Sequence, residues 1–108
     1  MKLKITEKEI QHLILQYLQL RKVFCWRNNT AAFAATYKGK ERFIRTGFVG
    51  SGDIIGLTPQ GRFFSIEVKV PGRQPTFEQI QFMNVIKANN GIAFVATCLE
   101  DVQKALDI

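Results

Sequence analysis

Apolar side chains recur at helical spacing near the start of the chain and at strand spacing further along. The first pattern predicts an amphipathic helix over residues 6–21. The apolar positions that carry it are Ile10, Leu13, Ile14, Tyr17 and Leu18. Thr6 and Glu9 have the spacing of a capping box at the start of this helix. Residues 23–28 then read as a short strand, apolar at its beginning and polar at its end.

The strand predicted over residues 63–70 organises the rest of the pattern, because successive side chains of a strand point to opposite faces. One face carries Phe64, Ile66, Val68 and Val70, and the other carries Phe63, Ser65, Glu67 and Lys69. An acid and a base two residues apart, on a strand otherwise suited to burial, indicate either a solvated sheet face or a functional site.

The segment before this strand predicts a hairpin with a defined turn. Residues 52–57 form its first arm. Pro59 favours the first central position of a type I turn, and Gly61 supplies the left-handed residue that follows. This chemistry predicts a three-residue loop in which Thr58 faces Arg62.

The same register places Asp53 opposite Glu67, whereas a shift of one residue would send these acids to different faces. Facing residues have Cβ atoms about 5 Å apart. Two carboxylates at that range repel by about 3 kcal/mol at an effective dielectric of about 20. A divalent cation between them turns the repulsion into attraction, and oxygen ligands suit a hard ion such as Mg²⁺ or Mn²⁺. Asp53, Glu67 and Lys69 are therefore interpreted as one site.

The last third of the chain reads as helix, strand and helix. Thr76 and Gln79 form a second capping box, which predicts a helix over residues 76–89. Residues 92–97 are almost continuously apolar, as is typical of a covered parallel strand. The connection from the preceding strand is therefore expected to be a right-handed crossover. A final helix is predicted over residues 99–108.

The stretch from residue 29 to residue 52 is the least regular. Lys38-Gly39-Lys40 looks like a turn, and residues 42–45 look like the second arm of a hairpin. Basic and aromatic residues interleave here, either as a surface that grips phosphates and bases or as a solvated ribbon whose aromatic side chains pack inward. The glycines before Asp53 either permit close approach of a ligand or belong to an ordinary loop.

Composition narrows the classes of function. The chain has 108 residues, which suits a single domain over residues 1–108. Its net charge of +6 favours an acidic partner, most simply nucleic acid. No apolar run has the length of a membrane span and no secretory signal opens the chain, so a cytoplasmic protein is expected. Cys25 and Cys98 lack paired spacing and are expected to be buried thiols rather than a disulfide or metal ligands.

The succession of helix, strand, acid-bearing hairpin, helix and strand resembles the PD-(D/E)XK nuclease fold. That fold is an α/β, restriction-endonuclease-like core with a mixed sheet flanked by helices in the order α-β-β-β-α-β. Within the superfamily the chain is most similar to the VRR-NUC domain, the virus-type replication-repair nuclease. The matching residues are Glu9, Arg27-Asn28, Gly50-Ser51-Gly52-Asp53, Glu67-Val68-Lys69 and Gln79. Gly52 departs from the pattern, since the superfamily often has proline there, but it lies outside the chemistry.

The resemblance implies metal-dependent hydrolysis of DNA phosphodiester bonds, with Mg²⁺ or Mn²⁺ as the cofactor. By analogy the backbone carbonyl of Val68 joins Asp53 and Glu67 as a metal ligand, and Lys69 orients the water. Glu9 and Gln79 each stay open to two interpretations, as a catalytic or metal-shell residue and as the third residue of a helix cap. Backbone contacts with nucleic acid are expected from Arg27, Asn28, Lys38, Arg45, Ser51 and Arg73.

Stand-alone members of this family are commonly phage proteins. The resemblance therefore implies a homodimer or higher homo-oligomer that acts on branched DNA, such as four-way junctions, in a bacterial or phage-infected host cell. The alternative is a basic nucleic-acid-binding or assembly module that keeps the fold without turnover. A restriction-type endonuclease would share the chemistry but would need a recognition element for which 108 residues leave little room.

Overall fold

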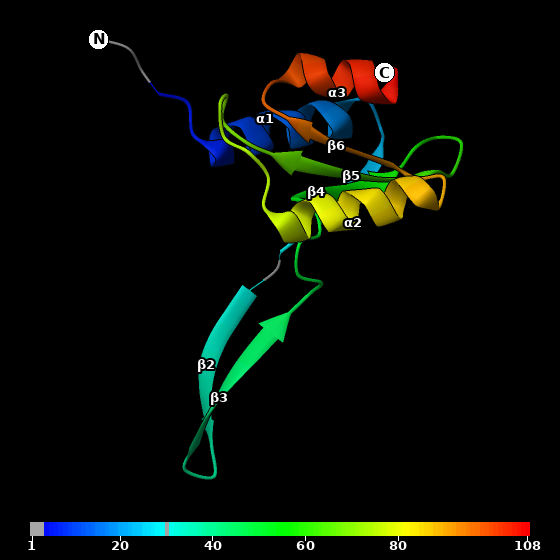
Figure 1. Cartoon of the computed structure of the whole chain (residues 1–108). Coiled ribbons are helices and arrows are strands. Elements are labelled where there is room, and N and C mark those ends of the chain that lie inside the picture. Colours follow the sequence, from blue (N-terminus) through cyan, green and yellow to red (C-terminus); the bar gives the residue numbers. More distant parts are fainter. Residues whose placement is uncertain (1–3, 30) are drawn as a thin grey trace.

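The computed structural model describes the backbone of residues 4–29 and 31–108, and the side chains of these residues except 31–35, 37 and 43–46. Figure 1 shows how its elements are arranged. The helices are α1 (Glu7–Leu20), α2 (Phe77–Ala88) and α3 (Leu99–Leu106). The strands are β1 (Phe24–Arg27), β2 (Ala31–Tyr37), β3 (Lys40–Thr46), β4 (Ile54–Leu57), β5 (Phe63–Val68) and β6 (Ile92–Ala96).

Threonine caps begin the first two helices, as the sequence predicts. The Glu9 backbone N–H donates to Oγ1 of Thr6, and the Gln79 N–H donates to Oγ1 of Thr76. The box at α2 is complete, since the Gln79 side chain also accepts from the backbone of Thr76. At α1 the Glu9 carboxylate instead accepts from the hydroxyl of Thr6 at 3.1 Å. These bonds satisfy N–H groups that a helix start leaves without partners, and so fix where each helix begins.

Four strands form the main sheet in the order β1-β4-β5-β6. β4 lies antiparallel to both β1 and β5, whereas β6 lies parallel to β5. The parallel pair is joined through α2, as expected for the strand-helix-strand pattern. The sheet is therefore mixed, with an antiparallel neighbour on one side of β5 and a parallel neighbour on the other.

The turn between β4 and β5 confirms the predicted register. The Thr58 N–H donates to the Arg62 carbonyl at 2.8 Å, and Gly61, at φ +86°, donates to the Thr58 carbonyl at 2.8 Å. Ile54 pairs with Ile66 further along the same ladder. Continuing that register by one residue places Asp53 opposite Glu67, so both acids lie on one face of the sheet.

Helices cover the two faces of the sheet unequally. α1 and α3 pack on the face formed by Ile54, Phe64, Ile66 and Val68, and this layer holds the main core. The hydroxyl of Tyr17 joins these two helices by donating to the carbonyl of Ile108 at 3.0 Å. α2 covers the opposite face over β5 and β6 alone. The β1 and β4 part of that opposite face consequently has no helix among the described residues packed on it.

The apolar side of α2 is only partly buried. Met83 is buried, whereas Ile80 and Val85 remain 41% and 59% exposed. The helix packs on only two strands of the sheet, β5 and β6. Its outward apolar residues therefore lie at the surface beside the loop that carries Phe48, whose ring lies 5.8 Å from that of Phe82.

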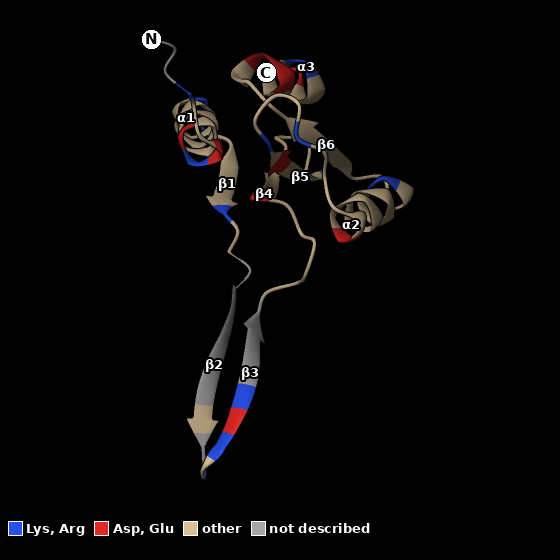
Figure 2. Ribbon diagram, turned by 60° about the vertical axis from the view of Figure 1, so that its left-hand side comes forward, with Lys and Arg blue, Asp and Glu red and all other residues tan. Residues whose placement is uncertain are grey.

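β2 and β3 form a separate two-stranded antiparallel sheet, which extends away from the rest of the molecule (Figure 1). The predicted turn at Lys38 and Gly39 and the predicted second arm are confirmed. Charged residues gather near the far end of this hairpin (Figure 2). The chain leaves the main sheet after β1 and returns to it at β4, so the hairpin interrupts two strands that are themselves neighbours.

The expected α/β class, with a mixed sheet flanked by helices, is confirmed. When β2, β3 and α3 are left out, the remaining elements follow the order α-β-β-β-α-β. Cys25 and Cys98 are free thiols of intermediate exposure, and burial raises the pKa of Cys25. Within the described ranges, no helix combines the length and the apolar character that crossing a bilayer requires.

Candidate active site

Asp53, just before β4, and Glu67, near the end of β5, form an acid pair. Asp53 directly precedes β4, where its N–H donates to the Ile66 carbonyl at 2.8 Å. Its Oδ2 accepts from the backbone N–H of Val68 at 2.7 Å, which holds the carboxylate against β5. Glu67 is only 4% exposed, and Asp53 lies opposite it in the register of the sheet. Two facing carboxylates repel each other unless a proton or a cation lies between them.

The surroundings of Glu67 disfavour its charged form. The pKa of Glu67 is raised to about 8, first by burial and then by the charge of Asp53 and hydrogen bonding with it. The charge of Lys69, two residues along the same face, opposes the shift. A divalent ion at this position would replace the proton, since opposite charge favours the ionised carboxylate.

Gln79 reaches the acid pair from the first turn of α2. Its Nε2 donates to Oε1 of Glu67 at 2.8 Å, while its Oε1 accepts from the Thr76 N–H at 2.7 Å. The cap role that the sequence left open for Gln79 is confirmed, and the same side chain also contacts Glu67. Because each end of the amide has a fixed partner, Gln79 holds Glu67 in one orientation.

The loop before Asp53 is fixed by close packing. A Cβ on Gly52 would lie 2.2 Å from Oγ of Ser65, and a Cβ on Gly50, at φ +85°, would lie 2.5 Å from the Glu78 carbonyl. The Asn28 amide donates to Oγ of Ser51 at 2.7 Å and to the Gly52 carbonyl at 3.0 Å. The glycines are thus required by the close approach of this loop to β5 and α2, and the loop in turn positions Asp53.

Ser65 lies next to the acid pair on the same face of β5 and was not singled out by the sequence. It is 1% exposed, and its hydroxyl has no hydrogen-bond partner among the described residues. A buried hydroxyl without a partner carries a desolvation cost. The burial of Ser65 becomes visible only in the structure, where Gly52 packs over it, because a serine on a strand gives no distinct sequence signal.

The donor set fits a hard divalent cation that keeps much of its water. Within residues 4–29 and 31–108, no three His, Cys, Asp or Glu side chains whose positions are described form a group that could hold a metal ion. Asp53 and Glu67 supply two carboxylates, and the Val68 carbonyl is the further oxygen that the family resemblance suggests. Mg²⁺ is commonly held by one or two carboxylates together with water and substrate phosphate. The acid pair therefore suits Mg²⁺ or Mn²⁺ better than it suits a zinc ion with four protein ligands.

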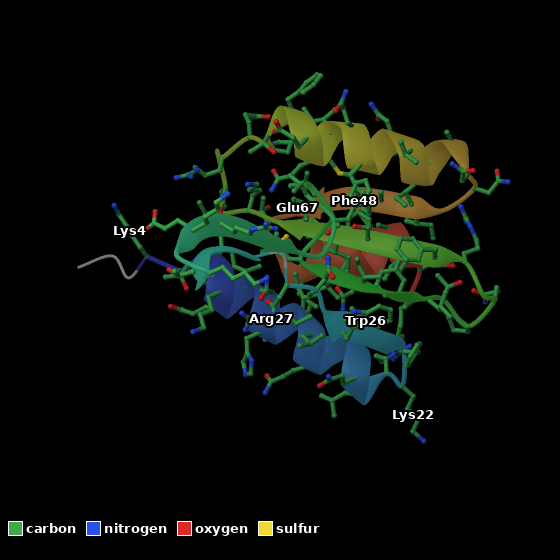
Figure 3. The ribbon with its side chains drawn as sticks, turned by 90° about the horizontal axis from the view of Figure 1, so that it is seen from below. Lys4, Lys22, Trp26, Arg27, Phe48 and Glu67 are labelled. Carbon is green, nitrogen blue, oxygen red and sulfur yellow. The ribbon has the colours of Figure 1, made fainter. Side chains whose placement is uncertain are left out.

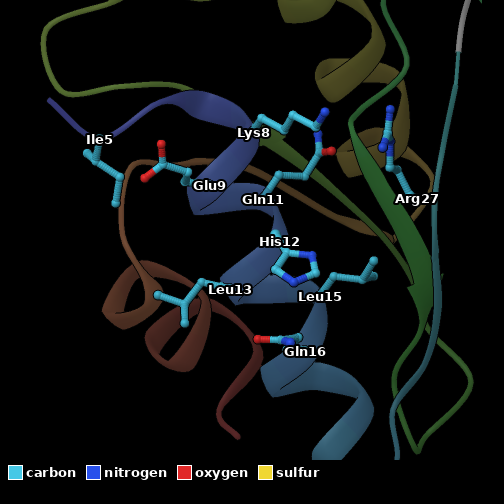
Figure 4. A pocket seen from close by; sticks show the side chains of 9 residues that line it. All are labelled: Ile5, Lys8, Glu9, Gln11, His12, Leu13, Leu15, Gln16 and Arg27. Carbon is cyan, nitrogen blue, oxygen red and sulfur yellow. The ribbon is translucent and has the colours of Figure 1, made fainter.

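The acid of α1 that acts on Glu67 is Glu7, whose charge raises the pKa of Glu67 further. Glu9, the residue that the sequence suggested, is exposed and accepts from the hydroxyl of Thr6. It lines a cavity of about 540 Å³ with His12, Leu15 and Arg27 (Figure 4). Both acids lie in the first turn of α1, so the sequence alone does not show which of them faces Glu67. The capping geometry shows it, because the side chain of the third helical residue, Glu9, turns back toward the cap at Thr6.

The residues expected to contact nucleic acid fall into two groups. Asn28 and Ser51 are partly exposed, and their side chains hold the loop before Asp53 through hydrogen bonds. Arg27, Lys38 and Arg73 are exposed, on β1, on the β2–β3 turn and after β5. The side chain of Arg45 lies outside the described set. Contacts from the exposed group stay predictions, whereas Asn28 and Ser51 have a structural role.

No protein-family model matches the chain, and no curated protein matches its sequence. The nature of the site therefore has to be inferred from its residues.

Proposed function

We propose that this protein is a metal-dependent endonuclease that hydrolyses phosphodiester bonds in DNA. The observation that carries the proposal is the register that places Asp53 opposite buried Glu67, with Lys69 on the same sheet face. An acid pair buried at a cost to the metal-free fold is expected where a cation completes it. The net charge of +6 supports an acidic polymer as the substrate.

Each residue of the site has a distinct task in this reaction. Asp53, Glu67 and the Val68 carbonyl would hold Mg²⁺ or Mn²⁺. When bound, such an ion polarises a phosphate oxygen and makes a coordinated water more acidic. Lys69 orients the attacking water and stabilises negative charge that develops on the phosphate. Gln79 keeps Glu67 in position through its 2.8 Å hydrogen bond and thereby fixes the shape of the metal site.

The substrate we propose is branched DNA, such as a flap or a four-way junction, cut by a homodimer or a higher homo-oligomer. No described element has the form of a helix that reads base edges, so recognition would depend on DNA shape rather than on sequence. A twofold dimer would present two equivalent sites to the two symmetric strands of a junction. The resemblance to the VRR-NUC family supports this substrate.

The decisive experiment is cleavage by the purified protein. Labelled linear, nicked, flapped and four-way DNA are incubated with Mg²⁺, with Mn²⁺ and with chelator, and the products are separated on a denaturing gel. We expect products only with metal and most strongly from branched DNA. Loss of Lys69 (Lys69→Ala) should abolish cleavage and leave DNA binding in chelator intact. The exposed Lys104→Ala on α3 is the matched control and should cleave normally.

Metal binding is tested separately through stability. Ions that bind the folded state raise the free energy of unfolding, so Mg²⁺ or Mn²⁺ should raise the melting temperature of the protein. Asp53→Asn should remove this effect and, above about pH 8 where Glu67 is charged, should slightly stabilise the metal-free protein by relieving repulsion with Glu67. Asp107→Asn, at an exposed left-handed position that asparagine tolerates, is the control. DNA binding without any metal effect or product would favour a non-catalytic binding module.

A further inference from the structure

Two exposed aromatic side chains lie on the same sheet face as the acid pair. Phe24 and Trp26 alternate with Cys25 along β1, and their rings lie 5.6 Å apart at an angle of 55°. They are 66% and 45% exposed, although large aromatic side chains are usually buried. We define Phe24 and Trp26 as the aromatic platform.

The register of the sheet fixes the distance from this platform to the proposed site. Trp26 pairs with Ile55, which lies two residues from Asp53 on the same face of β4. Strand spacings of about 4.8 Å across and 3.4 Å along place the Cα atoms of Trp26 and Asp53 about 8 Å apart. Asn28 lies between them at the next position on this face of β1 and holds the loop that leads to Asp53.

Cationic residues lie near both ends of β1. Figure 3 shows Trp26 between Lys22 and Arg27, with Glu67 further into the molecule. Lys22 lies two residues before β1 and Arg27 ends it, and both are exposed; the Arg27 side chain lies on the α1 side of the sheet, where it lines the cavity with Glu9. An exposed aromatic pair on a chain of net charge +6 suits a polyanion whose bases have free faces. It suits a second copy of this basic protein less well, because like charges would then meet at the interface.

We infer that the aromatic platform stacks an unpaired base of the nucleic-acid strand whose phosphate lies at the acid pair. A separation of about 8 Å places the stacked base within a few nucleotides of the scissile phosphate on the same strand. This inference rests on the proposed function and narrows its substrate to strands with unpaired bases near the cleaved bond.

Among the described residues, no helix packs on this edge of the sheet. α2 packs on β5 and β6, whereas the rings of Phe24 and Trp26 on β1 stay exposed, so a strand can lie on these rings within reach of Asp53. Stacked bases are tolerated without regard to sequence, because every base presents a flat face. The platform would thus favour flaps, gaps and branch points over continuous duplex, whose bases are already stacked.

The test uses the single tryptophan of the chain, Trp26, as its own reporter. Chelator is present throughout, so that binding is measured without cleavage. Oligothymidylate of about 12 nucleotides, within the usual site size, is compared with an abasic strand of the same length and charge. We expect the thymidylate to quench Trp26 emission and the abasic strand to leave it nearly unchanged.

Variants then separate stacking from charge. Trp26→Ala should weaken binding of the labelled thymidylate by about 5- to 150-fold, the range expected for loss of one stacked base. Trp26→Phe keeps a ring and should retain most of the affinity. Leu13→Ala, at an apolar position of similar exposure on α1, should bind like the unaltered protein.

Two results would overturn the inference. Equal quenching by the abasic strand would mean that phosphates alone are held. Emission that does not respond to thymidylate but shifts to shorter wavelength as the protein concentration rises would show that a second copy covers the platform. Quenching without cleavage in Mg²⁺ would contradict the nuclease proposal and support the base-binding surface. Cleavage without quenching would support the nuclease proposal and contradict the base-binding surface.

Discussion

The side-chain nitrogen of Gln79 donates a 2.8 Å hydrogen bond to Oε1 of Glu67, and the oxygen of the same amide accepts from the Thr76 N–H at 2.7 Å. One side chain thus joins the start of α2 to the acid pair. The position of the helix and the orientation of Glu67 depend on each other for this reason. Substitutions can separate the contribution of the bond to Glu67 from that of the helix cap at Thr76.

Removing the Gln79 side chain should cost more than removing the cap alone. Thr76→Ala deletes the cap acceptor and should lower the free energy of unfolding by about 1 kcal/mol. Gln79→Ala also leaves buried Glu67 without its donor and should cost about 1–3 kcal/mol more. Urea denaturation measures both values. Cleavage should fall in Gln79→Ala and persist in Thr76→Ala. Equal losses in the two variants would mean that the bond to Glu67 contributes nothing.

The stability of the metal-free protein should fall as pH rises from about 4.5 to about 8, because folding raises the pKa of Glu67 to about 8. Across this window the folded state binds a proton that the unfolded state has released. Each unit of pKa difference corresponds to about 1.4 kcal/mol. Urea denaturation in chelator at several pH values measures the slope. Glu67→Gln stays neutral and should flatten it, whereas the exposed Glu100→Gln should leave it unchanged. A slope that survives in Glu67→Gln would assign the effect to another group.

Glu7 should matter more to the site than Glu9. The charge of Glu7 acts on Glu67, whereas the Glu9 carboxylate accepts from Thr6. Glu7→Gln should therefore shift the pH dependence of cleavage to lower pH, because it removes a charge that raises the pKa of Glu67. Glu9→Gln keeps a cap-competent side chain and should change neither cleavage nor stability. Loss of activity in Glu9→Gln alone would restore the metal-shell role that the sequence suggested for it.

Gly52 and Ser65 should behave as a coupled pair. Gly52→Ala places a methyl group against Oγ of Ser65 and the Ile66 carbonyl, and overpacking of this kind costs about 1–3 kcal/mol. Ser65→Ala removes a buried hydroxyl that lacks a partner in the described part of the chain, and should stabilise the protein by about 1 kcal/mol. The double variant should lose less than the two changes summed. Strict additivity in the double-mutant cycle would mean that the two side chains do not meet.

The acid pair was predictable because local turn chemistry decides a long-range register. Pro59 and Gly61 set the loop, the loop sets which residues face each other, and Asp53 then falls opposite Glu67. Periodicity also located the helices and strands to within one or two residues at most ends. These features depend on neighbours in sequence, and such information is present in a single chain.

The features that sequence reasoning missed depend on which surfaces meet. Glu7 and Glu9 are equivalent in a sequence pattern and differ only in what each side chain contacts. Gln79 was identified, but its bond to Glu67 requires the approach of α2 to β5. Trp26 reads as a strand residue suited to a core, and its exposure follows from how little of the sheet α2 covers.

The β2–β3 hairpin leaves and re-enters the sheet at two residues that are already joined, since the Asn28 N–H donates to the Asp53 carbonyl at 2.8 Å. Its root is therefore closed without any contribution from the hairpin itself. The β2–β3 hairpin can therefore be lengthened, shortened or replaced while Asp53 and Glu67 keep their geometry. The length of the hairpin and the surface that it presents to a partner can then change without altering the acid pair.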